Sequence, residues 1–93
     1  MNAKRKGTRN EHRSMALLEA AGDRCTRSAA SLGEWDILGV STDGFVLVQV
    51  KVRDWPSAEE MEALRTFRCP ANCRKLTHRW RDWQRLPDVK EIA

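Results

Sequence analysis

The feature that most constrains the fold is the run Phe-Val-Leu-Val-Gln-Val-Lys-Val at residues 45–52. Its β-branched residues favour a strand, in which successive side chains point to opposite faces. Because apolar residues occur on both faces, we expect this strand to lie at the centre of a sheet that is covered on each side. Near its end, Gln49 and Lys51 share one face and need polar partners, since burying them unpaired costs several kcal/mol.

Turn signals place other strands beside this one. Thr42-Asp43-Gly44 predicts a tight hairpin that pairs the central strand with the strand before it. A small-residue loop is expected after the first strand. The strands that the pattern predicts cover residues 24–28, 35–40, 45–52 and 75–80.

Two capping boxes predict helices. Thr8 and Glu11 match the pattern that opens a helix, here running to about residue 21, with Glu11 in the first turn of the inward-packing face. Ser57 and Glu60 match a second box, which opens a helix to about residue 67. The order is helix, two or three strands, helix, strand, since residues 24–28 are short for a strand, and it predicts an α/β layer fold.

The chain of 93 residues suits a single domain covering residues 1–93. We expect residues 1–6 to form a basic arm and residues 88–93 a flexible tail. No apolar run approaches the roughly 20 residues of a membrane helix, so no membrane association is expected. The basic N-terminus lacks the apolar stretch of a secretory signal, which leaves the cytoplasm.

Three cysteines are a poor disulfide framework. Cys69 and Cys73, with His78 downstream, offer three ligands at an unusual spacing, whereas a zinc site usually has four. Reduced, partly buried thiols are therefore the favoured interpretation, with zinc as the alternative.

The polar end of the central strand predicts a metal site. Counted outward from the hairpin, Asp36 reaches the level of Gln49 to Lys51, within a residue of register. Asp36, the Gln49 side-chain oxygen and the Val50 carbonyl are oxygen ligands of the kind that magnesium prefers. A metal there suits phosphodiester hydrolysis, because it polarises the phosphate and lowers the pKa of a bound water. Lys51 could orient that water or offset developing negative charge.

Four segments of the sequence carry a resemblance to a known family. They are Lys6-Gly7-Thr8-x-x-Glu11, Arg27-Ser28-Ala29-Ala30-Ser31, Trp35-Asp36 and Gln49-Val50-Lys51. In this order they resemble the PD-(D/E)-x-K nuclease superfamily, and within it archaeal-type Holliday junction resolvases and virus-type replication-repair nuclease domains. The resemblance covers roughly residues 5 to 55 and implies a restriction-endonuclease-like αβββαβ core, with a small mixed sheet flanked by helices, and metal-dependent cleavage of DNA.

The resemblance assigns roles to individual residues. Asp36 matches the first acid of the motif, Lys51 its lysine, Glu11 the glutamate of the first helix, and Ser31 the small polar residue of the loop before the acid strand. Gln49 stands where the motif has its second acid, which removes one negative charge and should weaken metal binding. Trp35 stands where the motif name has proline, a common change.

Simpler structural roles remain open for these residues. Glu11 could serve only the Thr8 capping box. Asp36 could be a strand-edge acid paired with an arginine. Gln49 and Lys51 could be strand residues that emerge into solvent where the sheet ends.

The formal net charge of +4 suits a nucleic-acid partner. Arg9 and Arg13 lie one helical turn apart beside Glu11, where they could hold a phosphate. Near the C-terminus, tryptophans alternate with arginines and could stack on bases or sugars; alternatively, one tryptophan fills the core while the arginines face water. These C-terminal residues are Arg79, Trp80, Arg81, Trp83 and Arg85.

The expected function is a Mg²⁺-dependent endonuclease, with Mn²⁺ as a substitute, that cuts DNA, with branched DNA as a candidate substrate in recombination or repair. A homodimer is expected, because cutting both strands of a junction requires two sites. One alternative is a nucleic-acid-binding protein that keeps the scaffold without cleaving. Another is a small subunit of a larger assembly, with the basic C-terminal segment docked on an acidic partner.

Overall fold

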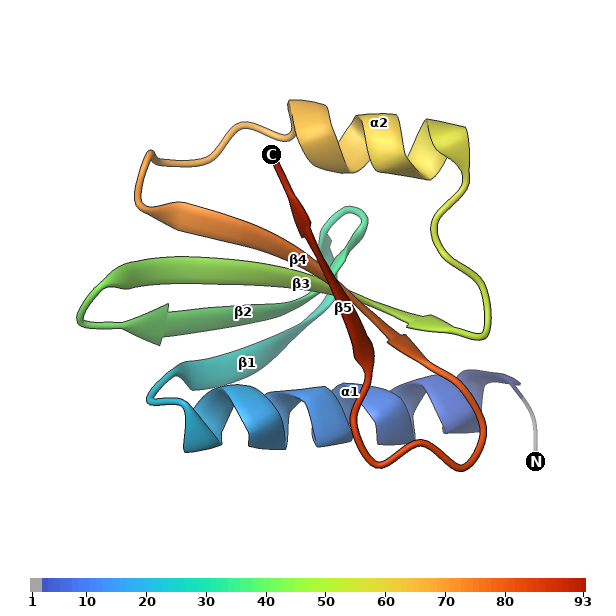
Figure 1. Cartoon of the computed structure of the whole chain (residues 1–93). Helices are drawn as coiled ribbons and strands as arrows, with labels where there is room; N and C mark the ends of the chain where they lie inside the picture. The colour runs from blue at the N-terminus through green and yellow to red at the C-terminus, as the bar shows by residue number, and fades with distance from the viewer. Residues whose placement is uncertain (1–2) are drawn as a thin grey trace.

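The computed structural model describes the backbone of residues 3–93 and the side chains of residues 7–28 and 32–93. The five strands form one sheet in the order β1-β2-β3-β4-β5, with α1 on one face and α2 on the other (Figure 1). The predicted α/β fold with a small mixed sheet flanked by helices is confirmed. The elements are α1 (Ala3–Ala20), β1 (Arg24–Leu32), β2 (Trp35–Ser41), β3 (Gly44–Val52), α2 (Ala58–Thr66), β4 (Cys73–Trp80) and β5 (Asp88–Ile92).

Strand β3 is the central strand, as its sequence predicts. Val46 and Val48 are buried on the α1 side, in a cluster with Leu18. Leu47 is buried on the α2 side, in a cluster with Leu64. Each of these side chains contributes about 2 kcal/mol when it is removed from water. The two-sided apolar pattern of β3 therefore fixes both layers of the fold.

The β2–β3 hairpin is also as predicted, with Ser41 paired to Gly44. Gly44 has φ +136, and a Cβ atom there would collide with the main-chain oxygen of Asn72. Glycine is therefore required where the chain before β4 crosses the hairpin. The register pairs Ile37 with Val48 and so brings the preceding residue, Asp36, to the polar end of β3.

Strands β3 and β4 are parallel, so the chain must cross over the sheet between them, and α2 makes this crossing. Ser57 and Glu60 form the predicted capping box at its N-terminus. At its C-terminus, the buried Lys75 ammonium donates to the carbonyls of Arg65 and Phe67, at 2.9 and 2.7 Å. Polar side chains thus form hydrogen bonds with free backbone groups at both ends of α2.

Two predicted boundaries near the N-terminus are wrong. Helix α1 begins at Ala3, so Thr8 lies inside the helix and cannot cap it. The alanine, lysine and arginine residues before Gly7 are good helix formers and extend the helix toward the N-terminus. Residues 1 and 2 of the expected basic arm lie outside the described residues. Strand β1 continues to Leu32, through the segment expected to be a loop.

The C-terminal segment is part of the sheet. Where a flexible tail was expected, residues 88–92 form β5, which pairs antiparallel with β4. Ile92 is buried in the α2-side cluster. The segment from Arg79 onward is therefore no free basic tail for docking a partner. Within residues 3–93, neither helix is long and apolar enough to cross a membrane.

The cysteine residues are free thiols. Cys69 and Cys73 pack on the α2 side of the sheet. His78 is buried on the other side, where its Nδ1 lies 2.9 Å from the Ser14 hydroxyl of α1. The structure therefore separates the three residues of the alternative zinc site.

Candidate functional site

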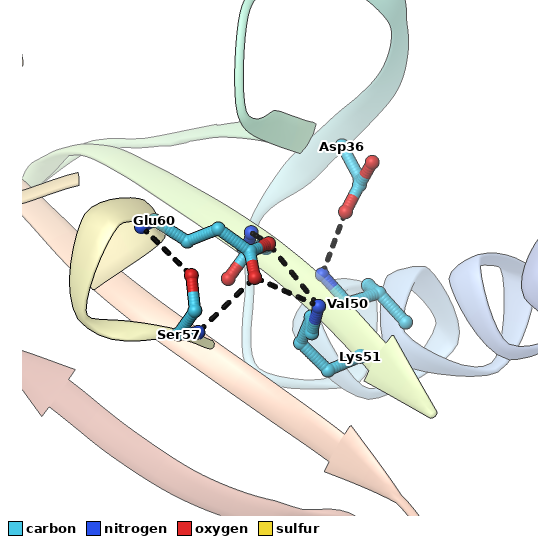
Figure 2. Close-up of polar contacts among 6 residues, drawn as sticks. Asp36, Val50, Lys51, Ser57 and Glu60 are labelled. Atoms are coloured by element: carbon cyan, nitrogen blue, oxygen red, sulfur yellow. Dashed lines mark hydrogen bonds and ion pairs between the residues drawn. The ribbon is translucent and has the colours of Figure 1, made fainter. Parts of the chain in front are cut away.

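Asp36 is held at the polar end of β3. One carboxylate oxygen, Oδ2, accepts a hydrogen bond from the Val50 amide at 2.7 Å. Figure 2 shows the carboxyl group reaching β3 from the side of β2. The structure therefore brings Asp36 to the Gln49–Lys51 segment, at the level that the hairpin count predicts.

The charge of Asp36 is poorly stabilised. Burial raises the pKa of this carboxyl group to about 6, and the negative charges of Glu11 and Glu34 add to the rise. The Val50 amide and the Lys51 ammonium act in the opposite direction. Burial and two neighbouring carboxylates make the negative charge of Asp36 unfavourable. A cation bound beside this acid would offset that charge, so the position favours cation binding.

Gln49 supplies an oxygen without a partner. Its side chain is only 4% exposed, and among the described residues its Oε1 has no hydrogen-bond partner. A buried oxygen without a partner costs free energy, and a hard cation would satisfy it. Within the described part of the chain, no three His, Cys, Asp or Glu side chains converge as metal ligands. The Asp36 carboxylate and the Gln49 amide oxygen are hard donors of the kind that suit an ion that keeps several of its waters.

Lys51 and Gln49 both contact Glu60, a residue to which the sequence assigned only a capping role. The Lys51 ammonium lies 3.1 and 3.4 Å from the two carboxylate oxygens of Glu60. The Gln49 amide nitrogen lies 3.5 Å from Glu60 Oε2. Figure 2 shows Glu60 reaching Lys51 from α2, across β3 from Asp36. The hydrogen bond from the Ser57 amide, and then the Lys51 ammonium, lower the pKa of Glu60.

Glu11 lies near this site without a direct bond to Asp36. Its Oε1 accepts a hydrogen bond from Arg27 Nε at 2.8 Å, which ties α1 to β1. Since Thr8 is inside the helix, the capping role for Glu11 does not apply. Its charge still acts on Asp36 by raising the pKa of that carboxyl group.

Two of the predicted DNA-binding arginines are engaged within the fold. The Arg13 guanidinium stacks on the ring of Trp80, 3.9 Å from its centroid, and donates to the Gln84 carbonyl at 2.6 Å. Arg79 donates to Asp88 at 2.7 and 3.2 Å. Neither guanidinium is free to take a phosphate without losing these contacts.

The other predicted DNA-binding residues are placed differently. Arg9, on α1, and Arg81, after β4, are both exposed. The backbone of Ser31 lies in β1, but its side chain is outside the described residues. Among the described residues, Arg9 and Arg81 are therefore the predicted phosphate contacts that face solvent, although Arg81 also lies 3.4 Å from a carboxylate oxygen of Asp88.

The structure is similar to that of Hjc, a Holliday junction resolvase from the hyperthermophilic archaeon Archaeoglobus fulgidus. The TM-score is 0.75 and the sequence identity 24%, over 94% of this chain and 73% of the resolvase chain. No protein-family model matches the chain, and a search of the curated proteins finds no match. The similarity shows that this chain shares the fold of that resolvase, a mixed sheet flanked by two helices.

Proposed function

We propose that this chain is a metal-dependent endonuclease that hydrolyses phosphodiester bonds in branched DNA such as a Holliday junction, in recombination or repair. The observation that carries the proposal is the position of the Asp36 carboxylate at the Val50 amide, next in sequence to Gln49, whose buried Oε1 has no partner among the described residues. The fold shared with a Holliday junction resolvase supports it. We propose Mg²⁺ as the cofactor, with Mn²⁺ as a substitute.

The residues have distinct roles in this proposal. Asp36, Gln49 Oε1 and the Val50 carbonyl would hold the ion. When bound, a divalent ion supplies polarisation of the phosphate and a water of lowered pKa. Lys51 offsets negative charge on the phosphate, for which its ammonium must exchange Glu60 for the DNA. Glu11 supports the site by its negative charge, which favours a cation beside Asp36.

The DNA would approach the molecule along its exposed cations. Arg9 and Arg81 are exposed on different elements, and the net charge of +4 favours a polyanion. We propose that two copies act together, because resolving a junction requires a cut in each of two strands.

An assay on several DNA forms tests the proposal. Plasmid, linear duplex, single-stranded and four-way DNA are incubated with Mg²⁺, Mn²⁺ or a chelator. The parent protein should cut four-way DNA only with metal, and Asp36→Asn should lower the rate by at least about 100-fold, since even indirect supports of a metal site contribute 10- to 100-fold. Asp43→Asn, at the exposed hairpin turn, is the matched control and should cut as the parent does. Equal rates for Asp36→Asn and the parent would refute the site.

A second candidate is a DNA-binding protein without cleavage activity. The observation that favours it is Gln49 in the position of an acid, with Lys51 already paired to Glu60. Gln49→Glu separates the two candidates: an active enzyme regains a second carboxylate and should retain or increase its rate and bind metal more tightly. A mobility shift of DNA without nicking, in the parent and in Gln49→Glu with either metal, would favour the binding protein.

A further inference from the structure

The loop between β4 and β5, residues 81–87, lies at the same end of the sheet as the candidate site. Strands β3 and β4 are parallel, and their register pairs Lys51 with Arg79 and Val52 with Trp80. The chain that leaves β4 after Trp80 therefore begins level with the residue that follows Lys51. Figure 1 shows this loop beside the N-terminal half of α1.

Polar contacts anchor the loop from several directions. The side chain of Gln84 accepts a hydrogen bond from the Arg81 amide at 2.7 Å and donates one to Asp88 at 3.3 Å. The main-chain carbonyl of Gln84 accepts a hydrogen bond from Arg13 of α1 at 2.6 Å. Asp82 forms an ion pair with Arg53, which follows β3, at 3.5 Å. The loop is thus tied to α1, to β5 and to the end of β3.

This anchored loop presents Trp83 to solvent. The side chain has a relative exposure of 101%, whereas Trp35 and Trp80 are buried. Trp83 also has φ +69, a conformation that is strained for a bulky residue. An exposed tryptophan is unfavourable for the free molecule, because its large apolar surface remains in water. Exposure and strain at one residue indicate a role in contact with another molecule.

The charges around Trp83 favour DNA over a second copy of the chain. Arg81 and Arg85 are both exposed. Arg81 lies 3.4 Å from a carboxylate oxygen of Asp88, whereas Arg85 forms no ion pair with any side chain that the structure describes. A two-fold contact through this loop would bring the arginines of both copies together, with like-charge repulsion. A DNA backbone would instead neutralise them, and a base has an apolar face that an indole covers well.

We propose that Trp83 stacks on a base face that no neighbouring base pair covers, as at a branch point or a single-stranded gap, while Arg81 and Arg85 contact the flanking phosphates. This inference rests on the proposed function and deepens it by naming the feature of DNA that the protein selects. Away from its ends, a continuous duplex offers no such face, so Trp83 would discriminate interrupted DNA from intact DNA.

The test compares binding by four proteins to three DNAs in the presence of a chelator, so that cleavage plays no part. The proteins are the parent, Trp83→Ala, Trp83→Phe and Leu86→Ala, an exposed residue of the same loop as the matched control. The DNAs are a four-way junction, a duplex with a short gap that carries 2-aminopurine, and a continuous duplex of equal length.

The expected result is selective. Trp83→Ala should weaken binding to the junction and the gapped duplex about tenfold, leave the continuous duplex unchanged, and abolish the quenching of 2-aminopurine that the parent produces. Trp83→Phe should retain most of both effects, and Leu86→Ala all of them. Equal weakening on all three DNAs, unchanged binding, or a change in oligomeric mass without DNA would overturn the inference.

Failure of this inference can be distinguished from failure of the proposed function. A parent protein that binds and quenches the gapped DNA but never cuts with metal would refute the endonuclease while supporting the role of Trp83. If the parent protein cuts junctions and Trp83→Ala binds and quenches as the parent does, the endonuclease is supported and the role of Trp83 is refuted. A parent that binds none of the three DNAs would refute both.

Discussion

Ser14 is a residue whose single hydroxyl group joins α1 to β4. It is buried and lies 2.9 Å from His78 Nδ1 and 2.8 Å from Trp80 Nε1. An indole nitrogen can only donate, so the hydroxyl accepts from Trp80, and its contact with His78 Nδ1 runs in the direction that the histidine tautomer sets. Burial lowers the pKa of His78 to about 4, so its ring is neutral at pH 7.

The neutral state of His78 makes the fold sensitive to acid. The folded pKa is about 4, below the ordinary 6.5, so the unfolded chain takes up a proton first as pH falls. We expect this residue to contribute stability that is complete above pH 6.5 and is lost between pH 6.5 and 4, to the extent of about 3 kcal/mol. Urea unfolding across this range measures it. His78→Gln should show a flatter pH dependence, and a slope equal to that of the parent would contradict the prediction.

Asp36 acts on stability with the opposite sign. Its folded pKa of about 6 lies above the ordinary 3.8, so its contribution is most favourable below pH 3.8 and is lost as pH rises through 6. Asparagine keeps an acceptor for the Val50 amide without the charge. We expect Asp36→Asn to be more stable than the parent at pH 7 by about 1 kcal/mol, a figure reduced for partial exposure, with no gain near pH 4. Thermal unfolding at both pH values checks this, with Asp43→Asn as a control that should show no gain.

Among the elements, those with a local signal could be predicted from the sequence. The apolar run of β3, the hairpin at Asp43 and Gly44, and the second capping box each determine structure within a few residues of themselves. The predicted start of α1 at Thr8 was wrong, because the helix propensity of the residues before Gly7 outweighs the capping pattern at Thr8. Strand β5 was missed because its five residues are mostly polar and become a strand only by pairing with β4.

In the candidate site too, local contacts could be predicted from the sequence and long-range contacts could not. The approach of Asp36 to the end of β3 could be predicted, because a two-residue hairpin fixes the register. The contact of Glu60 with Lys51 could not, because it depends on how α2 docks across the sheet. The capping box gave Glu60 a sufficient local role, and that role concealed its position beside the site.

Strand β5 should matter for stability, although it is short and lies at the edge of the sheet. Ile92 is buried against Leu47 and Leu64, whereas Val89 on the same strand is exposed. We expect Ile92→Ala to lower the free energy of unfolding by about 3 kcal/mol, through lost burial and the cavity that remains. Val89→Ala should lower it by less than about 0.5 kcal/mol. Urea unfolding compares the two, and similar small losses would show that β5 contributes little.

At the scale of the whole molecule, the exposed cations should determine how DNA binding depends on salt. Each phosphate contact adds about 0.9 to the slope of the logarithm of affinity against the logarithm of salt concentration. We expect Arg9→Ala and Arg81→Ala each to reduce this slope by about 1. Arg65→Ala, on α2 and paired with Glu62, should leave it unchanged. Salt titrations of junction binding measure the slopes, and equal slopes for all four proteins would remove Arg9 and Arg81 from the interface.

The parallel pairing of β3 with β4 has a consequence for the order of events during synthesis. When residues up to Asp54 have left the ribosome, the nascent chain already contains Asp36, Gln49 and Lys51 on the three strands β1, β2 and β3. One edge of β3 then waits for β4, and Glu60 of the crossover helix has not yet reached Lys51. The sheet around the candidate site is thus completed only when β4 has joined β3, so we expect unfinished chains to lack the proposed activity.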